Sequence, residues 1–192
     1  MNLSSGMKSG ALLLLVIAIL FVAGCTQPVT VPAGTATPTP TQSAPATPSV
    51  TLPSNETLKT EMATLAVTFA GDIDGKALAM ALAEGPNSTA FETVLGQLKT
   101  FKASDSRIVY LYTLEQVNGT VRFIVDADYG QPEGSGYLEE YPDAPAELKG
   151  PVTAPIGVGP YTDPWGTFIS GFAPVETGSN LTVILIGVDT RV

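Results

Sequence analysis

The residues best suited to chemistry in this chain are acidic and aromatic side chains in its C-terminal half. Asp126 and Asp128 lie two positions apart at the end of a predicted strand, so both side chains should leave the same face. Carboxylates on an otherwise apolar, covered face are costly unless a cation meets them. The pair therefore predicts capture of an amine or another organic cation. The alternative is that Asp126 caps the backbone amides of a loop and Asp128 lies at the water edge.

Further candidates lie in the long Gly- and Pro-rich stretch between Asp128 and Trp165 and where it re-enters the strands. Trp165, the only tryptophan, could form a pocket wall or stack on a cation, or it could only anchor the stretch. Asp163 is either a ligand contact or a turn residue before Pro164. Tyr129 could orient a ligand through its hydroxyl or simply cover the core. Loops of this length are uncommon in compact domains unless they bind something or are disordered.

Composition excludes several kinds of catalytic centre. The chain has no His and one Cys, which rules out a tetrahedral zinc site, a Ser-His-Asp triad, a Cys-His dyad and a disulfide framework. Its 18 acidic and 9 basic residues give a formal net charge of −9, which opposes binding to a phosphate backbone. We therefore expect no metal, no cofactor and no nucleic-acid partner. A hydrolase that uses carboxylate pairs is a lesser alternative.

The first 53 residues are not expected to fold. An apolar run over 11–23 is too short to span a bilayer but suits a signal peptide. It ends in a sequence, Val-Ala-Gly-Cys25, that resembles the lipobox of prokaryotic lipoproteins, which implies removal of 1–24 and a lipid anchor on Cys25. Residues 25–53 are rich in Thr and Pro and carry no charge, as in an extended stalk. The alternative is an uncleaved signal anchor. Both interpretations place the rest of the chain outside the cytoplasm.

Glycosylation acceptor sequences support an extracellular location. Every asparagine after position 53 is followed two residues later by Thr: Asn55, Asn87, Asn118 and Asn180. All four fall at the ends of predicted elements or in turns, where a bulky glycan has room. The pattern predicts a glycoprotein.

Residues 54–192 are predicted to form one α+β domain. The hydrophobic spacing predicts helices from Ser54 as N-cap to Gly71, over 76–84, and over 89–103 behind a capping box from Thr89 to Glu92. Strands are expected over 107–116, 120–128, 167–175 and 181–189. The last strand is apolar without alternation, which indicates a central position in the sheet.

Asn118-Gly119 predicts a tight hairpin turn, and the turn sets a register. Glu115 should face Arg122, Tyr112 should face Val125, and Leu111 should face Asp126. One face then carries mostly apolar side chains and is expected to lie against the helices: Tyr110, Tyr112, Leu114, Val121, Phe123 and Val125. The other face carries Asp126 and Asp128.

Stretches 108–114, 123–128, 162–175 and 186–189 occur in an order and spacing that resemble the extracytoplasmic Cache domains. These are the PAS-like sensor modules of membrane histidine kinases, cyclases and chemoreceptors. The resemblance implies a long N-terminal helix and shorter helices packed on a central antiparallel sheet, with a long loop covering a small-molecule pocket. It also implies that an acidic residue placed like Asp189 contacts a ligand amino group, although Asp189 could equally cap a strand end.

These features predict a lipid-anchored, extracellular sensor-type domain that binds an amine, an amino acid or a similar small metabolite and catalyses no reaction. Members of the resembling family that signal usually continue into a transmembrane helix and an output domain. This chain ends at Val192, so we expect a membrane-bound signalling or transport partner. The alternative is a structural or adhesive cell-surface glycoprotein without a ligand.

Overall fold

The computed structural model describes residues 52–178 and 182–192 of the chain. The predicted signal peptide, the lipid anchor at Cys25, nearly all of the stalk and the acceptor Asn180 lie outside these residues. Within the described ranges, no helix is both long and apolar enough to cross a membrane.

The N-terminal half of the described chain contains three α-helices close to the predicted ranges. They are α1 (Asn55–Asp72), α2 (Gly75–Glu84) and α3 (Thr89–Ser104). Ser54 is the N-cap of α1 as predicted, because its hydroxyl accepts a hydrogen bond from Thr57 N at 3.2 Å. The predicted cap of the third helix is wrong by one residue. Ser88 accepts from Phe91 N at 3.1 Å, and Thr89 is already inside the helix.

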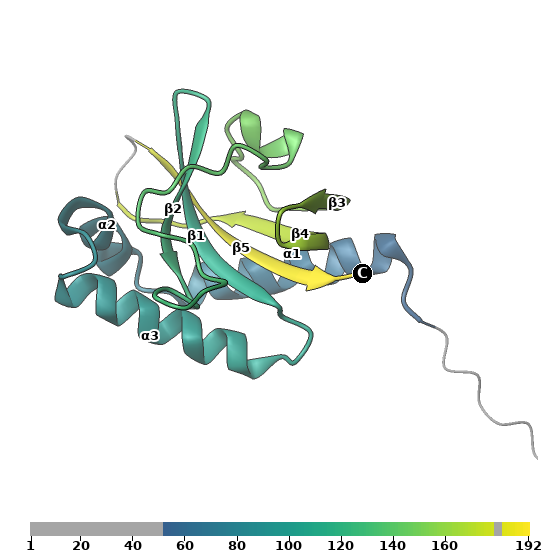
Figure 1. Cartoon of the computed structure of the whole chain (residues 1–192), viewed down its shortest axis with the longest axis horizontal. Coiled ribbons are helices and arrows are strands. Elements are labelled where there is room, and N and C mark those ends of the chain that lie inside the picture. Colours follow the sequence, from purple (N-terminus) through teal and green to yellow (C-terminus); the bar gives the residue numbers. More distant parts are fainter. Residues whose placement is uncertain (1–51, 179–181) are drawn as a thin grey trace, which may run out of the picture. The chain divides into compact units, whose positions relative to one another are not determined.

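The C-terminal half of the described chain forms one antiparallel sheet of five strands in the order β2-β1-β5-β4-β3 (Figure 1). The strands are β1 (Tyr110–Val117), β2 (Thr120–Asp126), β3 (Ile156–Asp163), β4 (Gly166–Pro174) and β5 (Val183–Arg191). Strand β5 is central, as its unbroken apolar sequence predicted. Helices packed on this sheet confirm the predicted α+β class.

The sequence did not predict strand β3, whose residues read as part of the long loop. It contains Gly157, Gly159 and Pro160, which disfavour the interior of a strand. The fold tolerates them because β3 lies at the edge of the sheet, where one side of the strand needs no hydrogen-bond partners. The stretch between Asp128 and Trp165 is therefore partly regular structure.

One face of the sheet carries the helices. Helix α1 runs across β3, β4 and β5, while α3 contacts β1 and β2 (Figure 1). Glycines let α1 approach: a Cβ at Gly171 would lie 2.0 Å from the Met62 carbonyl carbon, and a Cβ at Gly157 would lie 2.4 Å from Lys59 O. We call the buried residues of this face the helix-side core, and its largest members are apolar: Met62, Phe69, Leu78, Phe91, Leu98, Leu111, Ile124, Ile169 and Ile186.

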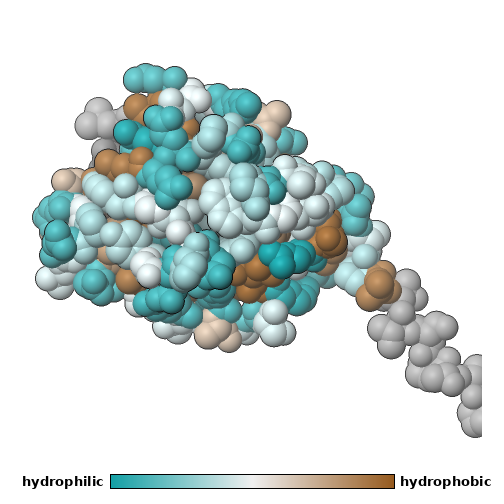
Figure 2. Space-filling model, in the orientation of Figure 1, coloured by the Kyte–Doolittle hydropathy of each residue, from teal (hydrophilic) through white to brown (hydrophobic). Residues whose placement is uncertain are grey.

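The opposite face is covered by the long loop. Segment 138–141 runs along the outer edge of β2, where Leu138 N donates to Phe123 O at 2.8 Å and Phe123 N donates to Glu139 O at 2.9 Å. A short 3-10 helix, η1 (Ala146–Lys149), follows. We call the buried residues beneath this cover the loop-side core: Tyr112, Leu114, Val121, Phe123, Tyr141, Ala144, Leu148, Val152, Val158, Phe172 and Leu185. The view in Figure 2 shows hydrophobic residues in small separate groups among hydrophilic ones, as expected when both cores are covered.

The hairpin turn agrees with the prediction. Asn118 and Gly119 have φ angles of 52° and 81°, the left-handed backbone that a two-residue hairpin turn requires. Next to the turn, Glu115 lies opposite Arg122 as predicted, and the two side chains form an ion pair with Oε1 and Nη2 2.5 Å apart. This pair gives Arg122 a structural partner.

Farther from the turn, a β-bulge changes the register. Tyr112 lies opposite Asp126, whereas the predicted partner was Val125. Thr113 Oγ1 stabilises the irregular backbone, because it accepts from Val125 N at 3.1 Å and donates to Val125 O at 3.2 Å. Ile124 and Val125 both lie in the helix-side core, and Asp126 returns to the loop side.

The predicted assignment of the two hairpin faces is wrong. Tyr112, Leu114 and Phe123 lie on the loop side, whereas Leu111 and Ile124 pack beneath the helices. Both faces of this sheet are buried, so an apolar face does not by itself indicate where the helices lie. The bulge then brings Asp126 onto the same side as the tyrosines, which regular alternation had separated from it.

Candidate functional site

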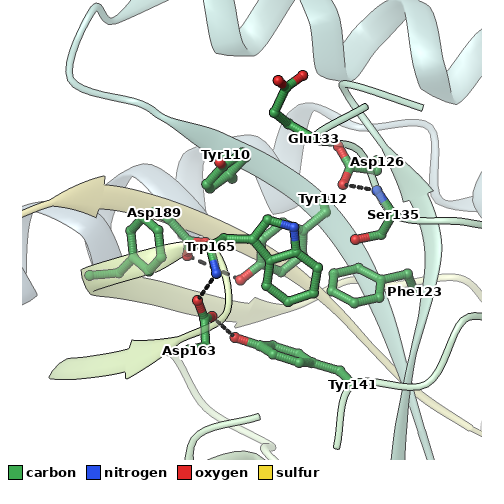
Figure 3. A pocket seen from close by; sticks show the side chains of 11 residues that line it. Tyr110, Tyr112, Phe123, Asp126, Glu133, Ser135, Tyr141, Asp163, Trp165 and Asp189 are labelled. Carbon is green, nitrogen blue, oxygen red and sulfur yellow. Dashed lines mark hydrogen bonds between the residues drawn. The ribbon is translucent and has the colours of Figure 1, made fainter. Parts of the chain in front are cut away.

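A pocket opens on the loop side of the sheet (Figure 3). Its enclosed cavity measures about 20 Å³, and about 280 Å³ when the open mouth is included. The enclosed part therefore holds a group about the size of one water molecule. The lining residues are Tyr110, Tyr112, Phe123, Asp126, Glu133, Ser135, Tyr141, Asp163, Trp165, Phe168 and Asp189.

Aromatic rings form much of the pocket wall. Trp165, in the turn between β3 and β4, lies edge-on to Phe123 and to Tyr141, with ring centroids 6.3 and 5.9 Å away. The Trp165 backbone N–H donates to Asp163 Oδ1 at 2.9 Å, which holds the turn in place. The structure thus puts both predicted residues of this turn, Asp163 and Trp165, in the pocket lining, and their contact with a ligand stays a prediction.

Asp189, near the end of β5, is 3% exposed and also lines the pocket. The Tyr112 hydroxyl donates to Asp189 Oδ1 at 3.0 Å. The Tyr112 ring lies against Gly187, where a Cβ would come within 2.4 Å of it. Burial raises the pKa of Asp189 to about 7, although hydrogen bonds from Ser170 and Tyr112 oppose the shift. A bound cation would favour the charged carboxylate.

Tyrosine hydroxyls also surround the neighbouring carboxylate. The Tyr141 hydroxyl donates to Asp163 Oδ2 at 2.6 Å, and the Tyr161 hydroxyl shares a hydrogen bond of 2.8 Å with Ser170 Oγ. Burial raises the pKa of Tyr141 and of Tyr161, so both keep their protons at neutral pH and can donate hydrogen bonds. Hydrogen bonds from neutral groups therefore hold Asp163 and Asp189 without neutralising them.

Asp126 has two roles in the structure. It is 3% exposed, and its carboxylate accepts hydrogen bonds from Asp128 N at 2.7 Å and from Ser135 N at 3.0 Å. The predicted alternative, capping of loop amides, is therefore observed, and the same carboxylate lines the pocket. Burial raises the pKa of Asp126, while the two backbone hydrogen bonds lower it.

Two predicted site residues lie outside the pocket. Asp128 does not share a face with Asp126, because β2 ends at Asp126 and the chain turns away. It forms an ion pair with Lys102 of α3. Tyr129 packs edge-on against Phe91 in the helix-side core, with ring centroids 4.9 Å apart. Asp128 and Tyr129 therefore do not line this pocket, and their contact with a ligand stays a prediction.

The pocket lining is acidic. Of the described residues that form it, four are Asp or Glu and none is Lys or Arg. Two cations contact lining residues: Lys102, over the Tyr110 ring, pairs with Asp128, and Arg191 lies over the Phe168 ring and donates to the neutral Trp165 O at 3.1 Å. In the part of the chain that the structure describes, no three His, Cys, Asp or Glu side chains could hold a metal ion.

Several lining residues were not found from the sequence. Tyr110, Tyr112 and Phe123 had been assigned to the helix side, and others had no distinguishing signal: Glu133, Ser135, Tyr141 and Phe168. The one sequence signal for these residues was the pair of aromatic side chains at alternate positions of β1, Tyr110 and Tyr112. Using it required knowing which face of the strand lies on the pocket side.

Three of the predicted glycosylation acceptors can be placed. Asn55, Asn87 and Asn118 are all exposed, at the start of α1, before α3 and in the hairpin turn. None of them lines the pocket. Their modification stays a prediction.

The solved structures similar to this chain include sensory domains of the Campylobacter jejuni chemoreceptor Tlp3. The sensory domain and its isoleucine-bound form each have a TM-score of 0.34 and 16% identity, and the L-valine complex has a TM-score of 0.32 and 16% identity. Each match covers 71% of this chain and 61%, 60% and 60% of the respective sensory domains. This degree of likeness carries no argument about ligand or activity. No protein-family model matches the sequence, and no curated protein matches it significantly.

Proposed function

We propose that residues 54–192 bind a small organic cation, with an amine as the recognised group, and catalyse no reaction. The observation that carries this proposal is the pocket lining, which combines acidic side chains with aromatic rings and contains, among the described residues, no Lys or Arg. It supports a sensor-type or solute-binding module.

The electrostatics favour a cationic guest. Buried carboxylates without a basic partner are costly to ionise, and a bound cation offsets that cost. A protonated amine can donate charge-assisted hydrogen bonds to such carboxylates, each contributing about 1.5 to 3 kcal/mol. The faces of Trp165 and the neighbouring tyrosines can add cation–π attraction of about 0.5 to 2 kcal/mol.

The same lining disfavours a free carboxylate on the ligand. An α-amino acid would bring its own carboxylate close to Asp163 or Asp189, with no basic side chain in the described lining to pair it. We therefore narrow the sequence-based expectation from amines and amino acids to amines. The size of the enclosed cavity, about 20 Å³, suits an ammonium group whose carbon chain extends through the mouth.

The test is ligand binding by the full-length chain in mild detergent, followed by thermal shift and calorimetry. Primary alkylamines should stabilise the protein by about 2.7 kcal/mol at a hundredfold excess over Kd, whereas the matching carboxylates should not. Asp189→Asn should weaken amine binding at least tenfold, because it removes the buried negative charge. The matched control is Asp143→Asn, since Asp143 is exposed and does not line the pocket.

Two results would contradict the proposal. One is the absence of stabilisation by any amine, and the other is equal binding of amines and carboxylates. Turnover of an ester, glycoside or amide substrate that is lost in Asp126→Asn or Asp163→Asn would instead favour the carboxylate hydrolase.

A structural or adhesive glycoprotein is the second candidate, and the small enclosed cavity favours it. The pocket carboxylates Asp126, Asp163 and Asp189 all have hydrogen-bond donors from the protein, as a purely structural polar network would. In that case the three Asp→Asn variants would lose stability, and no small molecule would restore it.

We also propose that the domain is held on the outer face of a membrane through Cys25 and serves a membrane-bound signalling or transport partner. The support is the lipobox-like sequence and the Thr- and Pro-rich segment after it. Metabolic labelling with a radioactive fatty acid tests the anchor: label should enter the chain and be lost in Cys25→Ser. Labelling that persists in Cys25→Ser would contradict it.

A further inference from the structure

We propose that the ligand carries two positive charges, one near each end, as an α,ω-diamine does. This inference rests on the proposed function, because it specifies the class of amine. The pocket has two separate acidic regions, which we call the inner pole, Asp163 and Asp189, and the outer pole, Asp126 and Glu133.

The strand register separates the poles. Tyr112 of β1 lies opposite Asp126 on one side and Gly187 of β5 on the other, and Asp189 is two residues beyond Gly187. Two strand spacings across the sheet and two residues along it put the Cα atoms of Asp126 and Asp189 about 12 Å apart. Carboxylates on Cα atoms this far apart can be contacted by the two ends of a short diamine.

Between the poles, the wall suits a hydrocarbon chain. Figure 3 shows the Trp165 ring between Asp163 and Asp189 at one end and Asp126 with Ser135 at the other, with Tyr112 and Phe123 beside it. Phe123 lies edge-on to the Tyr112 ring, with centroids 5.3 Å apart. Methylene groups packed on these rings would be removed from water, which favours binding of a ligand with a hydrocarbon chain.

The poles are parts of a cavity wall, unlike a cluster of acids on an open surface. Asp126 and Asp189 are each 3% exposed, and Glu133 is exposed at the mouth. Each buried carboxylate keeps free acceptor sites beyond the donors it already has, since a carboxylate offers about four. Repulsion from Asp126 contributes to the raised pKa of Asp189. A cation bound at either pole therefore also reduces the electrostatic repulsion felt by the carboxylates of the other pole.

The test measures calorimetric affinities of the full-length protein for two series of ligands. One series is α,ω-diamines that lengthen by one methylene at a time from ethylenediamine, and the other is n-alkylamines of the same lengths. Diamine affinity should peak at one chain length and exceed that of the matched monoamine by at least about tenfold, as expected for one additional charge-assisted hydrogen bond.

Variants assign the second charge to the outer pole. Glu133→Gln should reduce diamine affinity severalfold more than monoamine affinity, and the exposed Glu140 outside the pocket, changed to Gln, is the matched control. Asp126→Asn should reduce diamine affinity further. If Asp126→Asn disturbs the loop that Asp126 caps, the chain-length series on the unaltered protein still decides the question.

The outcomes separate the two proposals. Monoamines that bind as tightly as every diamine would overturn the two-pole inference and leave the proposed function intact. Failure of both series to bind would overturn both. A diamine optimum that survives unchanged in Glu133→Gln and in Asp126→Asn would also overturn it, because the second charge would then lie elsewhere.

Discussion

The two sides of the sheet are buried in different ways. On the helix side, backbone packs against backbone, with α1 lying directly on the glycines of β3 and β4. On the loop side, the sheet is covered by aromatic side chains, tyrosine hydroxyls and three carboxylates beneath a long loop. Both sides therefore contain a buried core, and the loop side adds the carboxylates and tyrosine hydroxyls that line the pocket.

The difference shows where this fold can accommodate change. A new methyl group at Gly171 under α1 meets main-chain atoms that cannot rotate away, whereas at Gly187 on the loop side it meets aromatic side chains. Polar groups on the loop side can also exchange a protein partner for a ligand. Four substitutions examine this contrast, in order of decreasing effect.

The largest effect is expected for Gly171→Ala on the helix side. A Cβ at this position would lie 2.0 Å from the carbonyl carbon of Met62, so α1 must move away from β4. We expect a loss of more than about 3 kcal/mol in the free energy of unfolding, measured by urea denaturation. Gly96→Ala is the matched control in α3: it has open space around it and should stabilise the protein by about 0.5 to 1 kcal/mol. Similar values for the two variants would show that the helix side is not tightly packed.

The second effect is a change in pH dependence in Asp189→Asn. The folded pKa of Asp189, about 7, is above the 3.8 of an aspartate in the unfolded chain, so the folded state binds more protons than the unfolded state between those values. This residue therefore stabilises the protein at low pH, and its contribution falls as pH rises through about 7, by at most about 4 kcal/mol. In Asp189→Asn this decline in the free energy of unfolding should be absent when urea denaturation is measured at several pH values between about 4 and 8.

Asp126 also has a raised pKa, so part of the pH dependence should remain in Asp189→Asn. Asp105 has a pKa lowered by its hydrogen bonds with Arg107 and contributes with the opposite sign. Parallel stability–pH profiles for the variant and the unaltered protein would show that Asp189 does not titrate in this range.

A smaller effect is expected for Gly187→Ala on the loop side. The new Cβ would come within 2.4 Å of the Tyr112 ring and 3.0 Å of the Phe172 ring, so these side chains must shift while the backbone can stay in place. We expect a loss of about 1 to 2 kcal/mol, together with a weaker hydrogen bond to Asp189. Amine binding should also weaken, as titration calorimetry would show. A cost equal to that of Gly171→Ala would remove the contrast between the two sides.

The smallest effect is expected for Asp128→Asn, which breaks the ion pair with Lys102. Both side chains are about one-quarter exposed, so solvent screens the pair and its loss should cost at most about 1 kcal/mol. Amine affinity should stay within about twofold, because Asp128 does not line the pocket. A tenfold loss of affinity would place Asp128 in the site after all.

Local patterns in the sequence predicted much of the fold. Ser54 as a cap and Asn118-Gly119 as a turn follow from interactions among near neighbours along the chain, and the unbroken apolar sequence of β5 indicated burial on both faces of the sheet. Strand β3 escaped prediction because Gly157 and Pro160 are acceptable only at a sheet edge, which is a property of the assembled sheet.

The candidate site was predictable only in part. Asp126, Asp163, Trp165 and Asp189 could be singled out as polar or aromatic residues at the ends of strands and in turns, and all four line one pocket. Asp128 was misplaced because strand alternation does not continue past the end of β2.

The sequence by itself determined the three helices and every strand except β3, because caps, turns and hydrophobic spacing act over a few residues. Only the tertiary structure decided which face of the hairpin lies beneath the helices and which side chains share the pocket. The physical reason for the first is that both faces of the hairpin are apolar enough to be buried, so hydrophobicity does not distinguish them. The reason for the second is the β-bulge held by Thr113, which shifts the alternation of side chains along β2 and brings Asp126 to the side of the tyrosines.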